Sequence, residues 1–524
     1  MSSAKRPPLL RAPQKLLFVA SEMTPLIKTG GLADVAGGLP AALARLGMDV
    51  RVLLPAYRDL ALAPEDCNIE ADFIPPPGMT DARLRAIPED HCGVSVWLLE
   101  SPGFSDRPGN PYLDASGQDW PDNAQRFNRL CRVAARIAGG RAGLAWQPDI
   151  VHANDWQTGL TPVWMMLERV EQPILFTIHN LQYRGDFDAS ILPALGLPFW
   201  LHHPDALEFY GRIALIKGGL VFADALSTVS PTYAEEIQTP ALGEGLDGLL
   251  RHRREVLYGV LNGIDADAWN PATDPHLPAH FDVSDLSGKA TVKRALQAEM
   301  GLAIRDDVPL LGFIARLVPQ KGIDLILDIL PELMTLPVQL VFLGSGMMEM
   351  EERLRQACAS APEQAACRIG FDEGLAHRIE AGCDLFLMPS RFEPCGLNQL
   401  YSLRYGTPPI VHRCGGLADS VMDTHAETLR SGTATGFQFA PATSTALLDA
   451  VRRALNLFRD RTAWNIVIQA GMRQDFSWAH SARRYRTIYQ SMTQSSLPVT
   501  AGEIAKQKKP GRDSAVCAKK KTNK

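Results

Sequence analysis

The sequence lacks the patterns that mark several common classes of protein. Its nine cysteines form no CxxC pair, so a disulfide framework and a zinc site are disfavoured and reduced thiols in the cytoplasm are expected. No stretch approaches the ~18 consecutive apolar residues of a membrane span. Residues 1–14 carry basic side chains without an apolar stretch, so we expect no secretory signal. These absences predict a soluble, cytoplasmic protein.

The chain also lacks an excess of positive charge. Its formal net charge is −5 over 524 residues, so neither nucleic acid nor a membrane surface is expected as a partner. The hydrophobic share of 46% and the charged share of 21% are ordinary for a globular protein. A chain of this length is expected to form two or three domains, each with its own core.

Several catalytic signatures are missing as well. The sequence has no HExxH and no GxSxG motif, and no DxD-type metal-binding pair stands out. We therefore expect a reaction that needs no metal ion and no cofactor. No lysine lies in a context that argues for pyridoxal phosphate, which disfavours a phosphorylase.

What the sequence does contain is two series of alternating strand and helix patterns. The first series predicts strands at 15–20, 49–55, 94–99, 149–153, 174–179 and 225–229, with helices at 31–46, 125–137, 158–168 and 210–222. The second predicts strands at 310–314, 339–343, 368–371, 383–389 and 409–412, with helices at 324–334, 348–359, 398–406, 445–458 and 461–474. Apolar strands in this order predict an α/β protein of two doubly wound, Rossmann-like domains that face each other across a cleft.

The composition suggests where these domains begin and end. We expect a flexible leader at 1–14, an N-terminal domain at 15–258 and a C-terminal domain at 259–477. A closing helix at 478–494 is expected to pack back on one half, for which we favour the N-terminal domain. The basic segment 495–524 is expected to be disordered.

Two glycine-rich turns each follow a strand, and the first of them also opens a helix. In the first, Gly30 and Gly31 allow a ligand to approach the backbone, and Lys28 adds a positive charge suited to a phosphate. This turn is neither a P-loop nor a GxGxxG motif, and without the lysine a plain tight turn would explain it. In the second turn, Gly415 and Gly416 precede Leu417 and are expected to expose N–H groups to an anion.

Polar residues also end two apolar strands of the first series. Asp155 and His179 follow such strands, on the side of a parallel sheet where ligands bind. Asp155 could instead cap the following helix, and a lone histidine is often part of the structure rather than a catalyst. Both readings stay open on spacing alone.

The second series contributes two cations and one carboxylate. Arg316 and Lys321 lie on the loop after its first strand, and Glu393 lies on the loop 390–397 after a later strand. A guanidinium grips phosphate oxygens with two hydrogen bonds, and a lysine adds a point charge. Together with the glycine turns, these groups are suited to stabilising the negative charge on a diphosphate leaving group.

These motifs, in this order, closely resemble those of bacterial glycogen synthases and plant starch synthases over about residues 15–490. The resemblance implies a GT-B fold and transfer of glucose from ADP-glucose to the non-reducing end of an α-1,4-glucan, either glycogen or a malto-oligosaccharide. It also implies that the anomeric configuration is retained. A front-face mechanism is favoured over a covalent glycosyl-enzyme, since the sequence offers one marked carboxylate rather than a pair.

The resemblance also assigns roles to single residues. It implies five catalytic residues. Glu393 would hold the donor glucose, and Arg316 and Lys321 would bind the diphosphate. Asp155 and His179 would line the glucose site. The residues it implies for ADP-glucose binding are Lys28, Gly30, Gly31, Cys395, Gly396, Leu397, Gly415, Gly416 and Leu417. Tyr112 and Trp156 are weaker candidates for acceptor contacts.

The chain departs from the family pattern at two positions. Asn154 stands where a histidine is common, and Cys414 where a threonine is common. The second change removes a hydroxyl beside the second glycine turn and bears on donor affinity.

Rival interpretations remain. One is a nucleotide-sugar epimerase or another GT-B transferase, with a UDP-glucose donor or a small acceptor. The other is an inactive glucan-binding protein, which would be expected to lack the cations or the glutamate.

Overall fold

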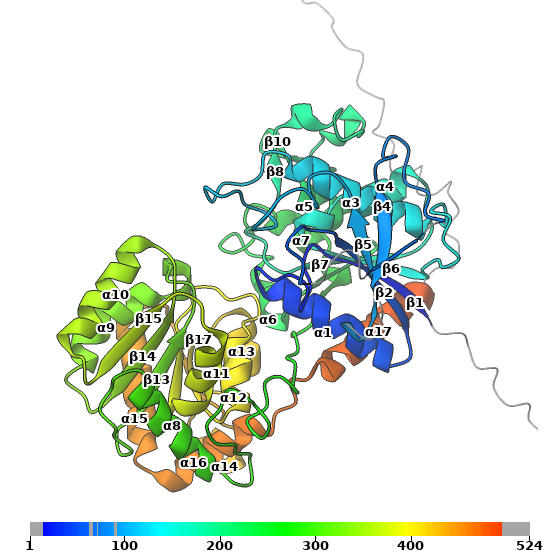
Figure 1. Cartoon of the computed structure of the whole chain (residues 1–524). Coiled ribbons are helices and arrows are strands. Elements are labelled where there is room, and N and C mark those ends of the chain that lie inside the picture. The colour runs from blue at the N-terminus through cyan, green and yellow to red at the C-terminus, as the bar shows by residue number, and fades with distance from the viewer. Residues whose placement is uncertain (1–13, 62–66, 71, 88–91, 495–524) are drawn as a thin grey trace, which may run out of the picture.

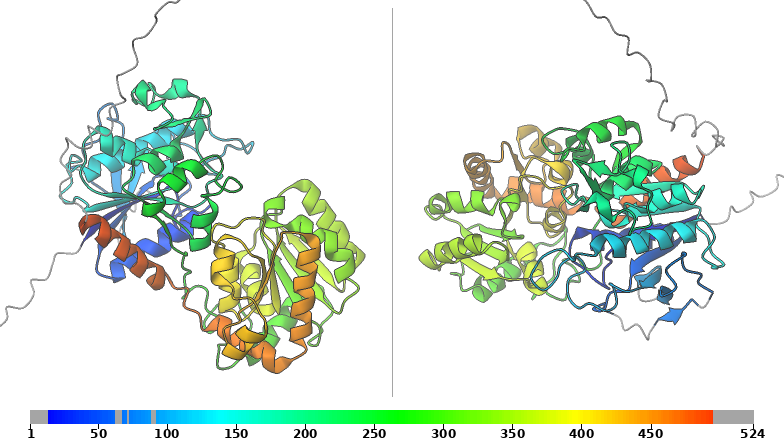
Figure 2. Two further views of the ribbon diagram at one scale, coloured as in Figure 1. Left: turned by 180° about the vertical axis from the view of Figure 1, so that it is seen from behind. Right: turned by 90° about the horizontal axis from the view of Figure 1, so that it is seen from above.

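The structure is a computed structural model that describes residues 14–61, 67–70, 72–87 and 92–494. The predicted leader and basic tail lie outside these residues, apart from residue 14. The described chain forms two lobes, each built on a sheet covered by helices (Figures 1 and 2). The prediction of an α/β fold with two doubly wound halves is confirmed by this architecture.

The first lobe is built on a nine-stranded sheet in the order β12-β11-β7-β6-β1-β2-β5-β4-β3. Its strands are β1 (Lys15–Val19), β2 (Asp49–Pro55), β3 (Asn68–Ile69), β4 (Arg83–Ile87), β5 (Ser95–Glu100), β6 (Ile150–Asn154), β7 (Ile174–Ile178), β11 (Ala225–Thr228) and β12 (Leu257–Gly259). All neighbouring strands pair in parallel except β3 with β4 and β4 with β5. This antiparallel edge was not predicted.

Helices cover both faces of the first sheet. They include α1 (Gly31–Arg45), α3 (Asn123–Ala138), α4 (Thr161–Leu167), α5 (Leu215–Phe222), α6 (Pro231–Glu236) and α7 (Asp247–His252). A separate small sheet has the order β8-β10-β9, with β8 (Asp186–Phe187), β9 (Glu208–Phe209) and β10 (Arg212–Ala214). The helix predicted at 210–222 was therefore wrong at its start, because Ile213 and Ala214 pair with β8 before the chain turns into α5.

The second lobe is built on a fully parallel six-stranded sheet in the order β15-β14-β13-β16-β17-β18. Its strands are β13 (Leu310–Ile314), β14 (Gln339–Gly344), β15 (Ala365–Ile369), β16 (Leu385–Met388), β17 (Pro409–His412) and β18 (Phe437–Phe439). Its helices are α8 (Ser287–Glu299), α9 (Ile323–Leu333), α10 (Met348–Ser360), α11 (Glu373–Gly382), α12 (Asn398–Arg404), α13 (Gly415–Ser420), α14 (Ala426–Ser431), α15 (Ser444–Phe458) and α16 (Arg461–Met472). Strand β18 and helices α8, α11, α13 and α14 were not predicted.

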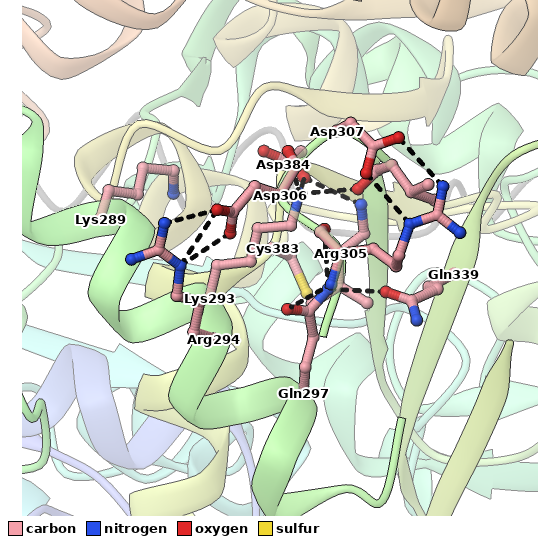
Figure 3. A network of polar contacts seen from close by, with 12 residues as sticks. Lys289, Lys293, Arg294, Gln297, Arg305, Asp306, Asp307, Gln339, Cys383 and Asp384 are labelled. Atoms are coloured by element: carbon pink, nitrogen blue, oxygen red, sulfur yellow. Dashed lines mark hydrogen bonds and ion pairs between the residues drawn. The ribbon is translucent and has the colours of Figure 1, made fainter. Parts of the chain in front are cut away.

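An ion pair between a buried lysine and a half-buried aspartate fixes helix α8 at the amino end of this second sheet. Lys293 Nζ lies 2.7 Å from Asp384 Oδ2, and the same oxygen accepts the N–H of Leu310 at 2.9 Å (Figure 3). Gln297 of α8 also donates to Gln339 at 2.7 Å. Since these contacts lie at the amino ends of the strands, they leave the carboxyl ends free to carry a site.

The closing helix α17 (Trp478–Gln494) packs against α1 of the first lobe (Figure 1). A Cβ added to Gly38 of α1 would lie 1.9 Å from Trp478 Nε1, so the indole rests directly on the α1 backbone. The chain thus crosses twice between the lobes, and the two crossings are joined where Ile264 donates its N–H to the carbonyl of Phe476 at 2.8 Å. This pair of crossings ties both lobes together at one place.

None of the helices in the described part of the chain is long and apolar enough to cross a membrane.

Candidate active site

The residues expected to form a site lie at the carboxyl ends of the strands in both sheets. Those of the second lobe follow β13, β16 and β17, and those of the first lobe follow β1, β6 and β7. In an open parallel sheet, the loops at this edge form the crevice where ligands bind. The chain order alone therefore gathers each half of the site on one side of its sheet.

Glu393 is the centre of the second-lobe half. Its side chain is buried, and its Oε2 lies 2.6 Å from Lys321 Nζ and accepts the hydroxyl of Ser390 at 3.0 Å. The pocket beside this carboxylate is lined by Phe313, Ile314, Ala315, Lys321, Leu387, Met388, Ser390, Glu393, Gly396, Leu397 and Asn398. A buried carboxylate held by a cation and a hydroxyl keeps a fixed orientation toward whatever enters this pocket.

The two predicted cations occupy different places. Lys321 ends a 3₁₀ turn, and Gly322 follows it with a φ of +73°. The backbone of Gly322 lies against the Pro389 carbonyl, because a Cβ added to this glycine would lie 2.2 Å from the carbonyl oxygen. This contact brings Lys321 to the Glu393 loop. Arg316 is exposed and donates to Gln320 Oε1 at 3.3 Å. The structure therefore joins Lys321 to Glu393 and leaves Arg316 on the rim.

The glycine turn after β17 holds the Glu393 loop. A Cβ on Gly415 would lie 2.0 Å from the carbonyl oxygen of Glu393, and one on Gly416 would lie 2.1 Å from that of Cys395. The Gly416 N–H donates to the Glu393 carbonyl at 3.1 Å, and the Gly415 N–H donates to Glu236 Oε1 at 3.0 Å. Both N–H groups expected to face an anion thus have protein partners here, and Leu417 is fully buried.

The Glu393 loop also forms part of the contact between the lobes. Ser230 Oγ donates to the Pro394 carbonyl at 2.6 Å. One residue of α6, Thr232, donates from its N–H and its hydroxyl to Asp419 at 2.8 and 2.7 Å. The position of the loop is therefore coupled to the position of the first lobe.

In the first lobe, a buried carboxylate organises the glycine turn after β1. Glu22 Oε2 accepts the Thr29 N–H at 2.5 Å, the Thr29 hydroxyl at 2.8 Å and the Gly30 N–H at 3.2 Å, while the Tyr112 hydroxyl donates to Oε1 at 3.2 Å. Burial nevertheless raises the pKa of Glu22. Lys28 pairs with Asp34 at 2.7 Å.

The space beside Gly31 is open. Apart from Gly31 itself, its two chain neighbours and the adjacent helix backbone, no described atom lies within 4 Å of the position where its Cβ would be. Protein packing therefore does not require a glycine here, and the missing side chain leaves room for a ligand to approach the backbone.

Asp155 and His179 meet at the ends of β6 and β7. Asp155 takes φ +57°, a conformation that costs energy for a non-glycine residue, and its Oδ1 accepts the His179 N–H at 2.8 Å. Burial raises the pKa of Asp155 to about 7 and lowers the pKa of His179 to about 3. The ring of His179 also reaches Asn154, with Nε2 3.0 Å from Oδ1.

The two weaker acceptor candidates lie within the first lobe. Tyr112 holds Glu22, as described above, and its hydroxyl also lies 2.8 Å from Ser21 Oγ. Trp156 is buried among aromatic neighbours, with its ring 5.3 Å from that of Phe127.

Three polar residues that hold the site together were not among the predicted site residues: Glu22, Glu236 and Ser390. Glu22 lies three residues after β1, so the rule that identified Asp155 could also have found it. Ser390 lies three residues before Glu393 on a loop that was already singled out. Glu236 gave no signal, since it belongs to a helix of the other lobe and meets Gly415 only in the folded chain.

Comparisons with known proteins identify the family to which the chain belongs. The starch synthase catalytic domain model matches residues 15–252, and the glycosyl transferases group 1 model matches residues 298–466. Glycogen synthase 1 of Methylococcus capsulatus is 53% identical over 475 residues, which cover 91% of this chain and 96% of that protein. The chain belongs to the glycogen synthase family. Its predicted resemblance to these enzymes is thereby confirmed.

Further relatives agree with this assignment. The glycogen synthase of Cellvibrio japonicus is 51% identical over 481 residues, which cover 91% of this chain and 99% of that protein. Among solved structures, the catalytic domain of starch synthase IV from Arabidopsis thaliana, bound to ADP and acarbose, is 33% identical with a TM-score of 0.82, over 92% of this chain and all (100%) of that one. The GT-B fold and glucosyl transfer in glycogen elongation are therefore the fold and the activity of this chain.

Proposed function

We propose that this enzyme transfers glucose from ADP-glucose to the non-reducing end of an α-1,4-glucan, with retention of the anomeric configuration. The observation that carries the proposal is the ion pair between the half-buried Lys321 and the buried Glu393, in a pocket at the carboxyl ends of β13 and β16. The starch synthase structure with ADP and acarbose supports the choice of donor and acceptor.

The roles of the second-lobe residues follow from their chemistry. Lys321 and Arg316 balance the charge that develops on the leaving ADP, and fixed charges of this kind stabilise a transition state without reorganising. Glu393 accepts hydrogen bonds from hydroxyls of the donor glucose. Cys395, Gly396 and Leu397 shape the pocket, and the Gly415–Leu417 turn keeps the Glu393 loop in place.

The first lobe supplies the other wall of the site. Lys28, Gly30 and Gly31 contact the nucleotide sugar, and Asp155 and His179 line the position of its glucose. The His179 carbonyl faces the positive charge that develops on the sugar. Because the Glu393 carboxylate is engaged by Lys321 and Ser390, we favour a front-face reaction over a covalent intermediate on Glu393.

The proposal assigns residues 259–477 to the donor side and 15–258 to the acceptor side, with helix 478–494 packed on the latter. The acceptor is glycogen or a malto-oligosaccharide. We assign the site of action to the cytoplasm.

A donor competition experiment tests the proposal. The protein is incubated with ADP-glucose or UDP-glucose, with and without glycogen, and the released nucleotide is measured. We expect ADP release that depends on glycogen and a much lower rate with UDP-glucose. Equal rates with both donors, or release that does not need an acceptor, would contradict it.

A further inference from the structure

Asn154, at the end of β6, has a fully buried side chain that faces three groups. Its Nδ2 lies 3.1 Å from the Val19 carbonyl and 3.4 Å from the His152 carbonyl, and its Oδ1 lies 3.0 Å from His179 Nε2. A carboxamide has donors on nitrogen only and acceptors on oxygen only. The contacts of Asn154 therefore depend on which way its amide is turned.

The two carbonyls fix that orientation. A flipped amide would place Oδ1 against the carbonyl oxygens of Val19 and His152, where acceptor would face acceptor. In a buried position, the loss of these hydrogen bonds would be costly. Oδ1 must then face His179, and it can only accept a hydrogen bond there.

The orientation of Asn154 in turn decides the protonation of the His179 ring. Since Oδ1 is an acceptor, Nε2 must carry the hydrogen. A neutral imidazole has a single N–H, and burial lowers the pKa of His179 to about 3, so the ring is neutral near pH 7. The other nitrogen, Nδ1, is consequently left with a free lone pair.

This lone pair is available to a ligand. Among the described residues, Nδ1 has no hydrogen-bond partner, and it is not one of the buried polar atoms that are shut off from solvent. The backbone of His179 is held as well, because its N–H donates to Asp155 Oδ1 at 2.8 Å. The ring therefore presents an acceptor in a fixed position at the carboxyl edge of the sheet.

We propose that Asn154 is a positioning residue that holds His179 in the tautomer protonated on Nε2, so that Nδ1 accepts a hydrogen bond from a hydroxyl group of the transferred sugar. The sugar as ligand rests on the proposed function, whereas the tautomer does not. Asn154 thus acts on the substrate through His179.

The tautomer is tested by NMR on protein labelled with ¹⁵N-histidine, with the His179 signals assigned by loss in His179→Gln. In the unchanged protein, we expect a neutral ring protonated on Nε2 near pH 7. In Asn154→Ala, we expect that preference to weaken or reverse. A ring protonated on Nδ1, or on both nitrogens, in the unchanged protein would overturn the proposal whatever the enzyme's donor is.

Asn128→Ala is the matched control. Asn128 is also a buried amide in the first lobe, where its Nδ2 donates to the Leu195 carbonyl at 3.0 Å and its Oδ1 accepts the Trp164 indole N–H at 2.7 Å. The Asn128→Ala substitution removes a comparable set of buried hydrogen bonds at a place that does not contact His179. We expect Asn128→Ala to lower stability as Asn154→Ala does, with the His179 signals and kcat/KM unchanged.

The contact with the sugar is tested with donors in which single glucose hydroxyls are replaced by hydrogen or by fluorine. Fluorine accepts a hydrogen bond weakly and cannot donate one, and hydrogen can do neither. At the hydroxyl that donates to Nδ1, both replacements should therefore lower kcat/KM to the same extent, on the order of tenfold. In Asn154→Ala, where Nδ1 can carry the hydrogen, the fluoro donor should regain activity over the deoxy donor. If no position behaves in this way, the contact is wrong. If ADP-glucose is no donor at all, the proposed function fails while the tautomer result stands.

Discussion

Lys321 Nζ lies 2.6 Å from Glu393 Oε2, although the two residues are 72 positions apart in the chain. The pair joins the loop after β13 to the loop after β16, which are neighbouring strands. The cation and the carboxylate form an ion pair in the lining of the pocket. A bound sugar diphosphate would bring its own charge to Lys321 and its hydroxyls to Glu393, so the same pair can serve both ends of the donor.

Glu393→Ala should lower turnover far more than it weakens ADP binding. The proposed function assigns Glu393 to the glucose hydroxyls and the two cations to ADP, and the substitution leaves the cations in place. We expect a loss in kcat on the order of 10²-fold, with the Kd for ADP changed little. Steady-state kinetics and calorimetry of ADP binding measure the two effects. Near-normal turnover in a correctly folded variant would rule out this role.

Lys321→Ala should remove transition-state stabilisation. A fixed cation at a leaving phosphate stabilises the transition state by several kcal/mol. A loss of about 3 kcal/mol should lower kcat/KM roughly 10²-fold. The variant also leaves Glu393 without its cation, and the double variant with Glu393→Ala separates the two effects in a double-mutant cycle. An unchanged kcat/KM in Lys321→Ala would contradict the assignment of this residue.

Gly415→Ala should damage activity through the Glu393 loop. The added Cβ would lie 2.0 Å from the Glu393 carbonyl oxygen, so the loop must move. Gly432→Ala is the matched control, since Gly432 also has a positive φ, of +67°, but a Cβ there meets nothing within 4 Å. We expect both variants to lose some stability and only Gly415→Ala to lose most of its kcat. Equal activity in the two variants would show that the turn does not position Glu393.

The fold was largely predictable because its strands are short, buried and regularly spaced. The predicted limits of β2, β13 and β17 agree with the structure to the residue. Prediction failed where tertiary contacts decide the local structure. Residues 212–214 have helical apolar spacing but become β10 because β8 and β9 lie beside them.

The site was predictable only in part, for a related reason. Each expected residue lies at the carboxyl edge of its sheet, as strand order dictates. Contacts between elements distant in sequence could not be read from the chain. The carboxylate of Glu236 meets Gly415 across the two lobes, and Lys28 pairs with Asp34 rather than standing free. The spacing of residues in the sequence predicted which chemical groups lie at the site. Only the folded structure shows which hydrogen-bond and ion-pair partners those groups have.

Asp155 should make stability depend on pH. Burial raises its pKa to about 7, whereas an unfolded aspartate titrates at about 3.9. The neutral acid is therefore favoured in the folded state, and the stability it contributes is complete below about pH 4 and is lost as the pH rises through about 7. Asp155→Asn stays neutral and lacks this dependence.

Urea unfolding of both proteins at about pH 5 and about pH 8 measures the difference. Relative to Asp155→Asn, the unchanged protein should lose roughly 3 kcal/mol of unfolding free energy between these two values. The pKa of His179, lowered to about 3 by burial, acts in both proteins and cancels in the comparison. The same pH dependence in the two proteins would show that Asp155 is not buried as described.

In the proposed function, the pocket of Glu393 and Lys321 transfers one glucose at a time from ADP-glucose to the end of a glucan, with retention. The most direct test uses ADP-glucose and a malto-oligosaccharide labelled at its reducing end, followed by mass spectrometry and by NMR of the new anomeric proton. We predict products that are one or more hexoses longer, joined by α-1,4 bonds at the non-reducing end, and formed far more slowly by Glu393→Ala. A β-linked product, or no elongation by the unchanged enzyme, would contradict the account.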